Sequence, residues 1–280
     1  IDHCHTSMGS RMLRSWITQP LRDPAVPRAR HEAVREMIEN ESLRDALSEP
    51  LKNLPDLERV ASRIALGSVR PRELSGLRDA LPALQRLSEA AALSRVPLIS
   101  DTAAILKPDP ALTDLLGRAL LELPAVTLRD GRVIADSFSD ELKELRELRD
   151  NAGNVLAQIE AREKERTGIP TLRVEYNRVS GYYIEVSRAQ ADKVPDDYRR
   201  RQTLKNTERF ITPELKSLED KALAAKDRAL ALERSLYQGL IESCSGYVDA
   251  LTRASEAAAT LDALLSFAKH AADMEWTCPE

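Results

Sequence analysis

The chain has 280 residues, of which 42% are hydrophobic and 31% are charged. It therefore has the composition of a folded protein and can bury a sizeable core, as one elongated domain or as two compact ones. It lacks a run of about 18 apolar residues, which excludes a transmembrane helix. A net charge of −4 at pH 7 argues against a uniformly basic nucleic-acid binder but leaves room for a local basic patch.

The sequence begins at Ile1 without a basic region followed by an apolar stretch, so no secretory signal is visible. We expect the chain to be part of a longer protein. Its three cysteines, Cys4, Cys244 and Cys278, lie far apart and are odd in number. They do not form a disulfide framework, which predicts a reducing, cytoplasmic environment.

Prolines divide the chain into two regions. Eleven of the fifteen lie before residue 125, and none lies in 125–169 or 214–278. Because proline interrupts helices, this distribution predicts several short helices in the first 124 residues and long helices later. One early helix is marked by Leu74, Leu77, Leu81, Leu84 and Leu87, with Pro71 near its start and Pro82 expected to kink it. Asp130-Gly131 predicts a short β-hairpin.

Two later stretches show the alternating three- and four-residue spacing of a packed helix seam. The first carries Phe138, Leu142, Leu145, Ala152, Leu156 and Ile159, and the second carries Leu215, Leu218, Ala222, Ala225, Ala229, Leu232 and Leu236. The outgoing helix is predicted to stop at Thr167-Gly168, and the returning helix to start at Thr212-Pro213-Glu214. We interpret them as an antiparallel pair, each helix about 40 Å long, with an insertion at the tip. Two helices of an ordinary bundle are the alternative.

The insertion, residues 169–212, alternates in the manner of β-strands. It holds five of the eleven aromatic residues of the chain. Strands are predicted near 172–177 and 182–187, and a third from Tyr198 to Leu204 that turns at Lys205-Asn206 and continues to Ile211. The residues between 177 and 181 form the first hairpin loop.

The insertion is also locally basic. Its nine basic side chains are Arg173, Arg178, Arg188, Lys193, Arg199, Arg200, Arg201, Lys205 and Arg209, against six acidic ones. Its net charge is therefore +3, whereas the rest of the chain carries −7, which favours contact between the tip and a polyanion. The arginines are followed by short polar side chains of the types that commonly bond phosphate oxygens. The other interpretation of the arginine run is a solvated strand face.

The motifs of enzymes are missing. The sequence contains no GxxxxGK[ST] phosphate loop, and Cys244 and Cys278 have no CxxC partners. We therefore expect no catalytic residues, no metal site and no bound cofactor in this chain.

The longer motifs resemble the MutS family of DNA mismatch-repair proteins. The segments that carry the resemblance are Thr6–Arg14, Pro20–Asp23, Leu57–Arg59, Arg70–Leu74, Arg166–Gly168, Asn177–Val186, Arg200–Asn206 and Thr212–Leu215. They are ordered and correctly spaced across essentially the whole chain. Ser180 departs from the pattern, since it stands where related chains often carry His.

The resemblance implies a mainly α fold. A multi-helix lever, or core, domain with a long antiparallel helix pair carries a small antiparallel β-rich clamp domain inserted at the tip. The implied boundaries are 1–152 for the first part of the lever, 153–212 for the clamp with its β-rich part at 169–212, and 213–280 for the returning helices and the start of a truncated ATPase domain. ATP and Mg²⁺ belong to that ATPase domain, which is absent here, so this chain by itself is expected not to be an enzyme.

The resemblance also implies a function and partners. In the family, two clamps of a homodimer close around double-stranded DNA and touch its backbone without reading sequence. A MutL-type repair partner and a cytoplasmic, nucleoid-associated location in a bacterium are implied as well. The residues that carry over as DNA contacts are Asn177, Arg178, Arg201, Thr203, Lys205 and Asn206. Each also has a structural explanation, because Asn is a natural turn residue and Arg or Thr can pair across strands.

Two other functions fit the same pattern. A coiled-coil scaffold could bind a protein partner through Tyr182, Tyr183 and Tyr198 as aromatic anchors. An antiparallel helix pair could instead form an RNA-binding arm. Exposure of the tyrosines tests the first alternative, and competition between duplex DNA and structured RNA tests the second.

Overall fold

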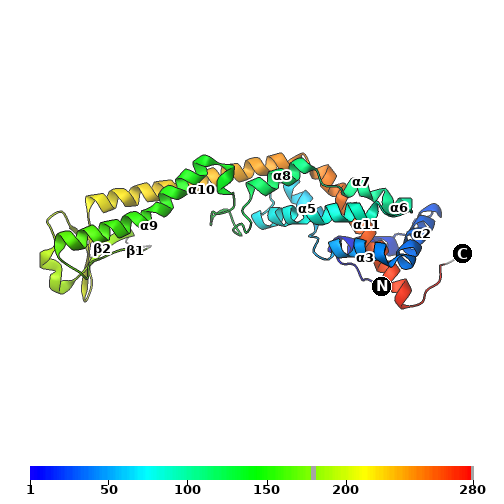
Figure 1. Cartoon of the computed structure of the whole chain (residues 1–280), viewed down its shortest axis with the longest axis horizontal. Coiled ribbons are helices and arrows are strands. Elements are labelled where there is room, and N and C mark those ends of the chain that lie inside the picture. Colours follow the sequence, from blue (N-terminus) through cyan, green and yellow to red (C-terminus); the bar gives the residue numbers. More distant parts are fainter. Residues whose placement is uncertain (178–180, 279–280) are drawn as a thin grey trace. The chain divides into compact units, whose positions relative to one another are not determined.

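The structure is a computed structural model that describes residues 1–177 and 181–278 (Figure 1). Helices provide most of its secondary structure, and one small antiparallel sheet completes it. The prediction of a mainly α fold with a small β-rich part is therefore confirmed. The chain divides into two compact units: residues 1–135 together with 236–280, and residues 136–235. The three domain boundaries implied by the family resemblance stay a prediction.

The first unit begins with a series of mostly short helices, as the proline distribution predicts. They are α1 (Ser7–Thr18), α2 (Ala25–Glu39), α3 (Glu41–Leu51), α4 (Leu57–Ala65), α5 (Pro71–Ala91), α6 (Pro97–Ser100), α7 (Thr102–Leu106) and α8 (Pro110–Ala119). Pro71, Pro97 and Pro110 each occupy the first position of a helix. This position suits proline because its fixed φ is helical and the missing N–H would have no partner there. The leucine stripe of α5 is buried over its whole length.

Helix α11 (Val248–Asp273) is the central helix of the first unit. It packs against α1, α2, α4 and α7. Its buried Asp262, which is 0% exposed, accepts hydrogen bonds from the backbone N–H of His5 at 2.9 Å and of Thr6 at 2.8 Å. The Thr6 hydroxyl donates a third at 2.7 Å, and also caps α1 by accepting from the Gly9 N–H. A carboxylate of α11 thus fixes the start of α1.

The predicted hairpin at Asp130-Gly131 is wrong. The chain does turn back there, but only an isolated bridge between Leu120 and Ile134 forms, with no regular strands on either side. Positive φ falls on Gly131 and Arg132, one residue later than the two-residue turn requires. The segment 119–135 is held instead by spaced backbone hydrogen bonds, including Leu121 N–H to the Val133 carbonyl at 3.0 Å.

The second unit is built on two long helices. A short 3-10 helix, η1 (Asp136–Phe138), precedes α9 (Asp140–Thr167), and α10 (Pro213–Ser245) follows the sheet. Both predicted helix ends are confirmed. Gly168 closes α9 in the left-handed region with φ of 65°, a conformation that suits glycine. The Thr212 side chain caps α10 by accepting from the Leu215 N–H at 3.2 Å.

Helices α9 and α10 run antiparallel, because ion pairs join them in reverse order. Arg162 pairs with Glu214 near the end of α9, and Arg146 pairs with Glu233 near its start. The predicted seam is confirmed at its buried members, which are Leu142, Leu145, Ile159, Leu215, Ala222, Ala225 and Ala229. Other members are half-buried, namely Leu156, Leu218, Leu232 and Leu236, and Phe138 precedes α9, in η1. The side chain of Ala152 lies outside the described part of the chain.

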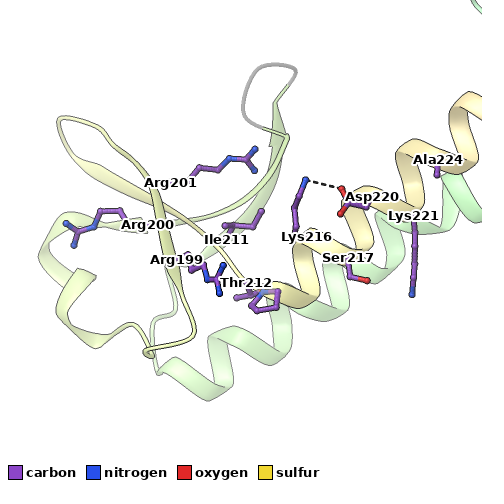
Figure 2. Close-up of a pocket in the computed structure, with 11 residues that line it drawn as sticks. Arg199, Arg200, Arg201, Ile211, Thr212, Lys216, Ser217, Asp220, Lys221 and Ala224 are labelled. Carbon is purple, nitrogen blue, oxygen red and sulfur yellow. Dashed lines mark ion pairs between the residues drawn. The ribbon is translucent and has the colours of Figure 1, made fainter.

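Four antiparallel strands form the sheet that connects the two helices. They are β1 (Arg173–Asn177), β2 (Gly181–Ser187), β3 (Arg199–Thr203) and β4 (Thr207–Ile211), in the spatial order β1-β2-β4-β3. A 3-10 helix, η2 (Arg188–Lys193), joins β2 to the segment before β3. The predicted strands are confirmed, and β4 leads directly into α10 through Thr212 (Figure 2).

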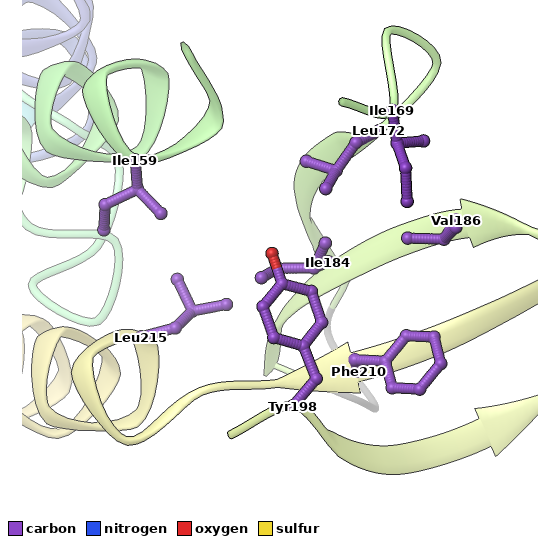
Figure 3. Close-up of a cluster of buried hydrophobic side chains, with 8 residues drawn as sticks. All are labelled: Ile159, Ile169, Leu172, Ile184, Val186, Tyr198, Phe210 and Leu215. Atoms are coloured by element: carbon purple, nitrogen blue, oxygen red, sulfur yellow. The ribbon is translucent and has the colours of Figure 1, made fainter. Parts of the chain in front are cut away.

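A single apolar cluster joins the sheet to both helices (Figure 3). Ile159 of α9 and Leu215 of α10 contribute from the helices. The sheet and its connections contribute Ile169, Leu172, Ile184, Val186, Tyr198 and Phe210. Burial of these side chains stabilises the sheet against the helix pair.

Edge strand β1 is also tied to α9 by a carboxylate. Glu160 accepts from the Val174 N–H at 2.9 Å and pairs with Lys164 at 2.6 Å. The Lys164 ammonium, followed by the Val174 N–H, holds the pKa of Glu160 below its ordinary value. The pKa of Glu160 is thus lower in the folded chain than in the unfolded chain, so its charged carboxylate stabilises the fold at pH values above the unfolded pKa. This stabilisation is lost as the pH falls through the folded pKa.

Replacing Glu160 with glutamine is therefore expected to lower the free energy of unfolding by about 1 kcal/mol at neutral pH. The difference from the unmodified chain should vanish when both are unfolded in urea at a pH below the folded pKa. A difference that persists in acid would show that the carboxylate charge is not what stabilises β1.

Candidate nucleic-acid interface

The β3–β4 hairpin carries four of the residues for which the sequence predicts DNA contact. Thr203 ends β3, and Lys205 and Asn206 occupy the turn before β4. The turn is fixed by its backbone: Leu204 N–H donates to the Thr207 carbonyl at 2.9 Å, and Arg188 N–H donates to the Asn206 carbonyl at 3.0 Å. A rigid backbone therefore presents the side chains of this turn.

Thr203, Lys205 and Asn206 are exposed. Within residues 1–177 and 181–278, their side chains make no hydrogen bond or ion pair. An ammonium group, a hydroxyl and an amide thus stand next to one another with their donors directed to solvent. These groups can bond phosphate oxygens without reading bases.

Arg201, the fourth residue, is in a different environment. It lies at the point where the pairing of β3 with β4 shifts register, between Arg200 and Gln202. Its Nη1 lies 3.4 Å from the Tyr182 carbonyl oxygen and 3.7 Å from Oε2 of Glu219 on α10. Its charge is therefore partly compensated within the unit before any ligand arrives.

Glu219 was not anticipated as part of this region. Its 5% exposure is unusual for a helical glutamate, and its Oε1 fills the space beside Gly181, where an added Cβ would lie 1.9 Å away. Gly181 also has a φ of 65°, which is unfavourable for residues with a Cβ. The backbone conformation and the proximity of Glu219 therefore both require glycine at position 181. The signal was present in the sequence: Glu219 follows Leu215 by four residues and precedes Ala222 by three, which places it on the buried stripe.

The sheet does not bring all predicted contact residues together. Asn177 pairs with Gly181 at one end of the β1–β2 hairpin, whereas Ser187 at the other end of β2 pairs with Thr207, beside the β3–β4 turn. The two loops predicted to touch DNA therefore lie at opposite ends of the sheet. Arg178 and Ser180, in the first loop, lie outside the described residues.

The tyrosines of the insertion are mostly structural. Tyr183 and Tyr198 are 3% and 7% exposed, and Tyr182 packs against the apolar cluster. The Tyr198 hydroxyl donates to Glu163 of α9 at 2.9 Å. Burial, together with this hydrogen bond, raises the pKa of Tyr198. These positions weigh against Tyr182, Tyr183 and Tyr198 as anchors for a protein partner.

Several basic residues of the insertion are already paired. Arg209 lies 3.0 Å from Glu185, Arg200 lies 2.9 Å from Glu208, and Arg173 lies 3.9 Å from Glu175. Lys205 and Arg199 have no ion pair among the described residues. The charge available to a polyanion is therefore concentrated on fewer side chains than the count of nine basic residues suggests.

Other kinds of site were also sought in the described part of the chain. Its His, Cys, Asp and Glu side chains form no group of three or more that could hold a metal ion. None of its helices combines the length and apolar character needed to cross a bilayer.

Together these features define a mainly helical chain with an inserted sheet, one turn of which exposes a hydroxyl, an ammonium and an amide group. A family model described as MutS domain III matches residues 1–268. The chain therefore belongs to the MutS family of DNA mismatch-repair proteins, and the matched domain is one of the non-catalytic domains of these proteins.

Proposed function

We propose that residues 136–235 form the clamp-bearing part of a mismatch-repair protein and hold duplex DNA through its phosphate backbone, independently of sequence. The observation that carries this proposal is the β3–β4 turn, where Thr203, Lys205 and Asn206 are exposed on a fixed backbone. These side chains offer donors of the types that bond phosphate oxygens, which position a protein on DNA without carrying sequence information. A protein that must scan DNA for mismatches requires this kind of contact.

The wider role follows from the family. The chain supplies the lever and clamp, two copies close around DNA, and the binding is coupled to an ATPase domain that carries ATP and Mg²⁺. The chemistry of the full protein resides in that domain, and this chain acts by binding. A MutL-type partner and a nucleoid-associated, cytoplasmic location complete the proposal.

The direct test is titration of labelled duplex DNA with the 280-residue chain at several salt concentrations. About three phosphate contacts predict a slope near −3 for log K against log salt, with a Kd on the order of 10⁻⁴–10⁻⁶ M. Matched and mismatched duplexes should bind alike. Binding that ignores salt, or that prefers the mismatch, contradicts the proposal.

Replacing Lys205 with Glu and Asn206 with Asp is expected to weaken binding at least about tenfold on every sequence, because both changes place negative charge beside phosphate. Exposed Lys107 and Asn53, in the first unit, allow the same chemical change as a matched control, Lys107→Glu with Asn53→Asp. Equal affinities of the two double variants would remove the turn from the interface.

RNA binding is the second candidate function, since phosphate contacts alone do not distinguish the two nucleic acids. Competition of unlabelled duplex DNA against structured RNA separates them. Preferential displacement by RNA would assign the sheet to an RNA-binding arm.

A further inference from the structure

A basic groove lies between β3 and the first turns of α10, at the end of the sheet away from the β3–β4 turn (Figure 2). It has a volume of about 850 Å³. The charged side chains that line it are Arg199, Arg200, Arg201, Lys216, Asp220 and Lys221. Its lining thus carries five cations against one carboxylate.

Three of the five cations are engaged within the unit. Arg200 pairs with Glu208 at 2.9 Å, Arg201 lies 3.7 Å from Glu219, and Lys216 pairs with Asp220 at 3.0 Å. Glu208 and Glu219 are buried, at 5% exposure each. A buried carboxylate does not readily give up its cation, because it would be left desolvated and uncompensated. Lys216 also lies 3.4 Å from buried Glu219, so it is held in the same way as Arg201.

The remaining two, Arg199 and Lys221, are exposed and have no ion pair among the described residues. Arg199 begins β3 and lies beside Thr212 at the start of α10, whereas Lys221 lies further along the helix (Figure 2). The available cations are therefore spread along the groove and do not converge on one point.

We propose that this groove binds the phosphodiester backbone of duplex DNA, with Arg199 and Lys221 as direct phosphate contacts. The inference rests on the proposed function and adds a second contact region to it. Four residue steps separate Arg199 from Thr203, so the groove and the turn are about 13 Å apart along β3. A DNA strand that runs along β3 can therefore contact both the groove and the β3–β4 turn.

The test uses the 280-residue chain and labelled duplex at several salt concentrations. Replacing Arg199 and Lys221 with glutamine is expected to lower affinity about tenfold and to reduce the steepness of the salt dependence by about 1.8, since two phosphate contacts are lost. The matched control, Lys226→Gln with Arg234→Gln, removes the same charge from exposed positions of α10 outside the groove. It is expected to keep the slope of the unmodified chain.

A photocrosslinker provides a second measurement that does not depend on the charge variants. Benzoylphenylalanine in place of Ser217, which lines the groove, should crosslink to the duplex, whereas the same group at Lys226 should not. Inorganic phosphate at matched ionic strength should not displace the duplex. Displacement would identify a site for a single anion and overturn the assignment.

The outcomes separate the two proposals. If the duplex binds but the groove variant matches its control and Ser217 gives no crosslink, the groove is not an interface, and the turn stays as the proposed contact. If the unmodified chain does not bind duplex at all, the proposed function fails and the groove assignment fails with it.

Discussion

Replacing Glu233 with alanine is expected to lower the free energy of unfolding of residues 136–235 by about 4 kcal/mol. Glu233 of α10 is 2% exposed, and its Oε1 lies 2.6 Å from Nη2 of Arg146 on α9. Arg146 is equally buried and also pairs with Asp136. Removing Glu233 deprives the buried guanidinium of one of its carboxylate partners, and breaking a buried ion pair from one side costs more than the net value of the pair itself.

The two units can be followed separately in this experiment. Both tryptophans, Trp16 and Trp276, belong to the first unit, so their fluorescence reports its unfolding, while far-UV circular dichroism reports the helices of both units. The Glu233 variant should shift the dichroism transition in urea and leave the fluorescence transition in place. Glu165→Ala, at an exposed position of α9, is the matched control and should change neither.

Replacing both members of the pair should restore most of the loss. Arg146→Met combined with Glu233→Leu removes the buried charges together and fills the space with apolar side chains, which is often neutral or stabilising. A surface ion pair contributes less than about 1 kcal/mol. If replacing Glu233 alone lowers the free energy of unfolding by no more than this, the two charges are solvated, and the burial seen in the structure is contradicted.

Replacing Asp262 with alanine has the second largest expected effect, a loss of about 3 kcal/mol in the first unit. The variant leaves the His5 and Thr6 N–H groups without their charged acceptor and also removes the acceptor of the Thr6 hydroxyl. The variant also leaves a void beside Gly9, because the Asp262 side chain fills the space where a Cβ on Gly9 would lie.

Trp16 measures this effect directly, since its ring stacks on Phe267 of α11 with centroids 6.5 Å apart. Urea unfolding followed by tryptophan fluorescence should shift to lower denaturant for the Asp262 variant. Asp249→Ala, at an exposed position of the same helix, serves as the control. Equal midpoints for the two variants would mean that the carboxylate does not hold α1 in place.

The parts of the fold that depend on local sequence were predictable. The start of α10 at Thr212-Pro213 and the end of α9 at Gly168 follow from capping chemistry within a few residues. The strand alternation and the helix seam likewise repeat over short distances. The prediction of a hairpin at Asp130-Gly131 was wrong. The chain turns there, but the flanking residues form only an isolated bridge and do not pair as strands.

The parts that depend on distant partners were not predictable. Asp262 looks like a solvated helix position until Thr6, which is 256 residues away, is placed beside it. Glu233 has the seam spacing of a buried residue, but its partner Arg146 lies 87 residues away. The candidate site likewise has a part that was predictable and a part that was not. The exposed turn at Lys205-Asn206 was anticipated from residue types, whereas the groove depends on β3 meeting α10. The count of charged residues also did not predict that Arg200 and Arg201 are compensated by carboxylates.

The position of β3 at the edge of the sheet has a consequence for self-association. An edge strand offers unpaired backbone N–H and C=O groups to any other extended chain, and such edges can nucleate aggregates. In β3 every residue is exposed, and three consecutive arginines occupy its first half. Charge repulsion between two such edges keeps a second molecule from adding its own strand. The arginines thus protect the protein from polymerising through β3 when no polyanion covers them.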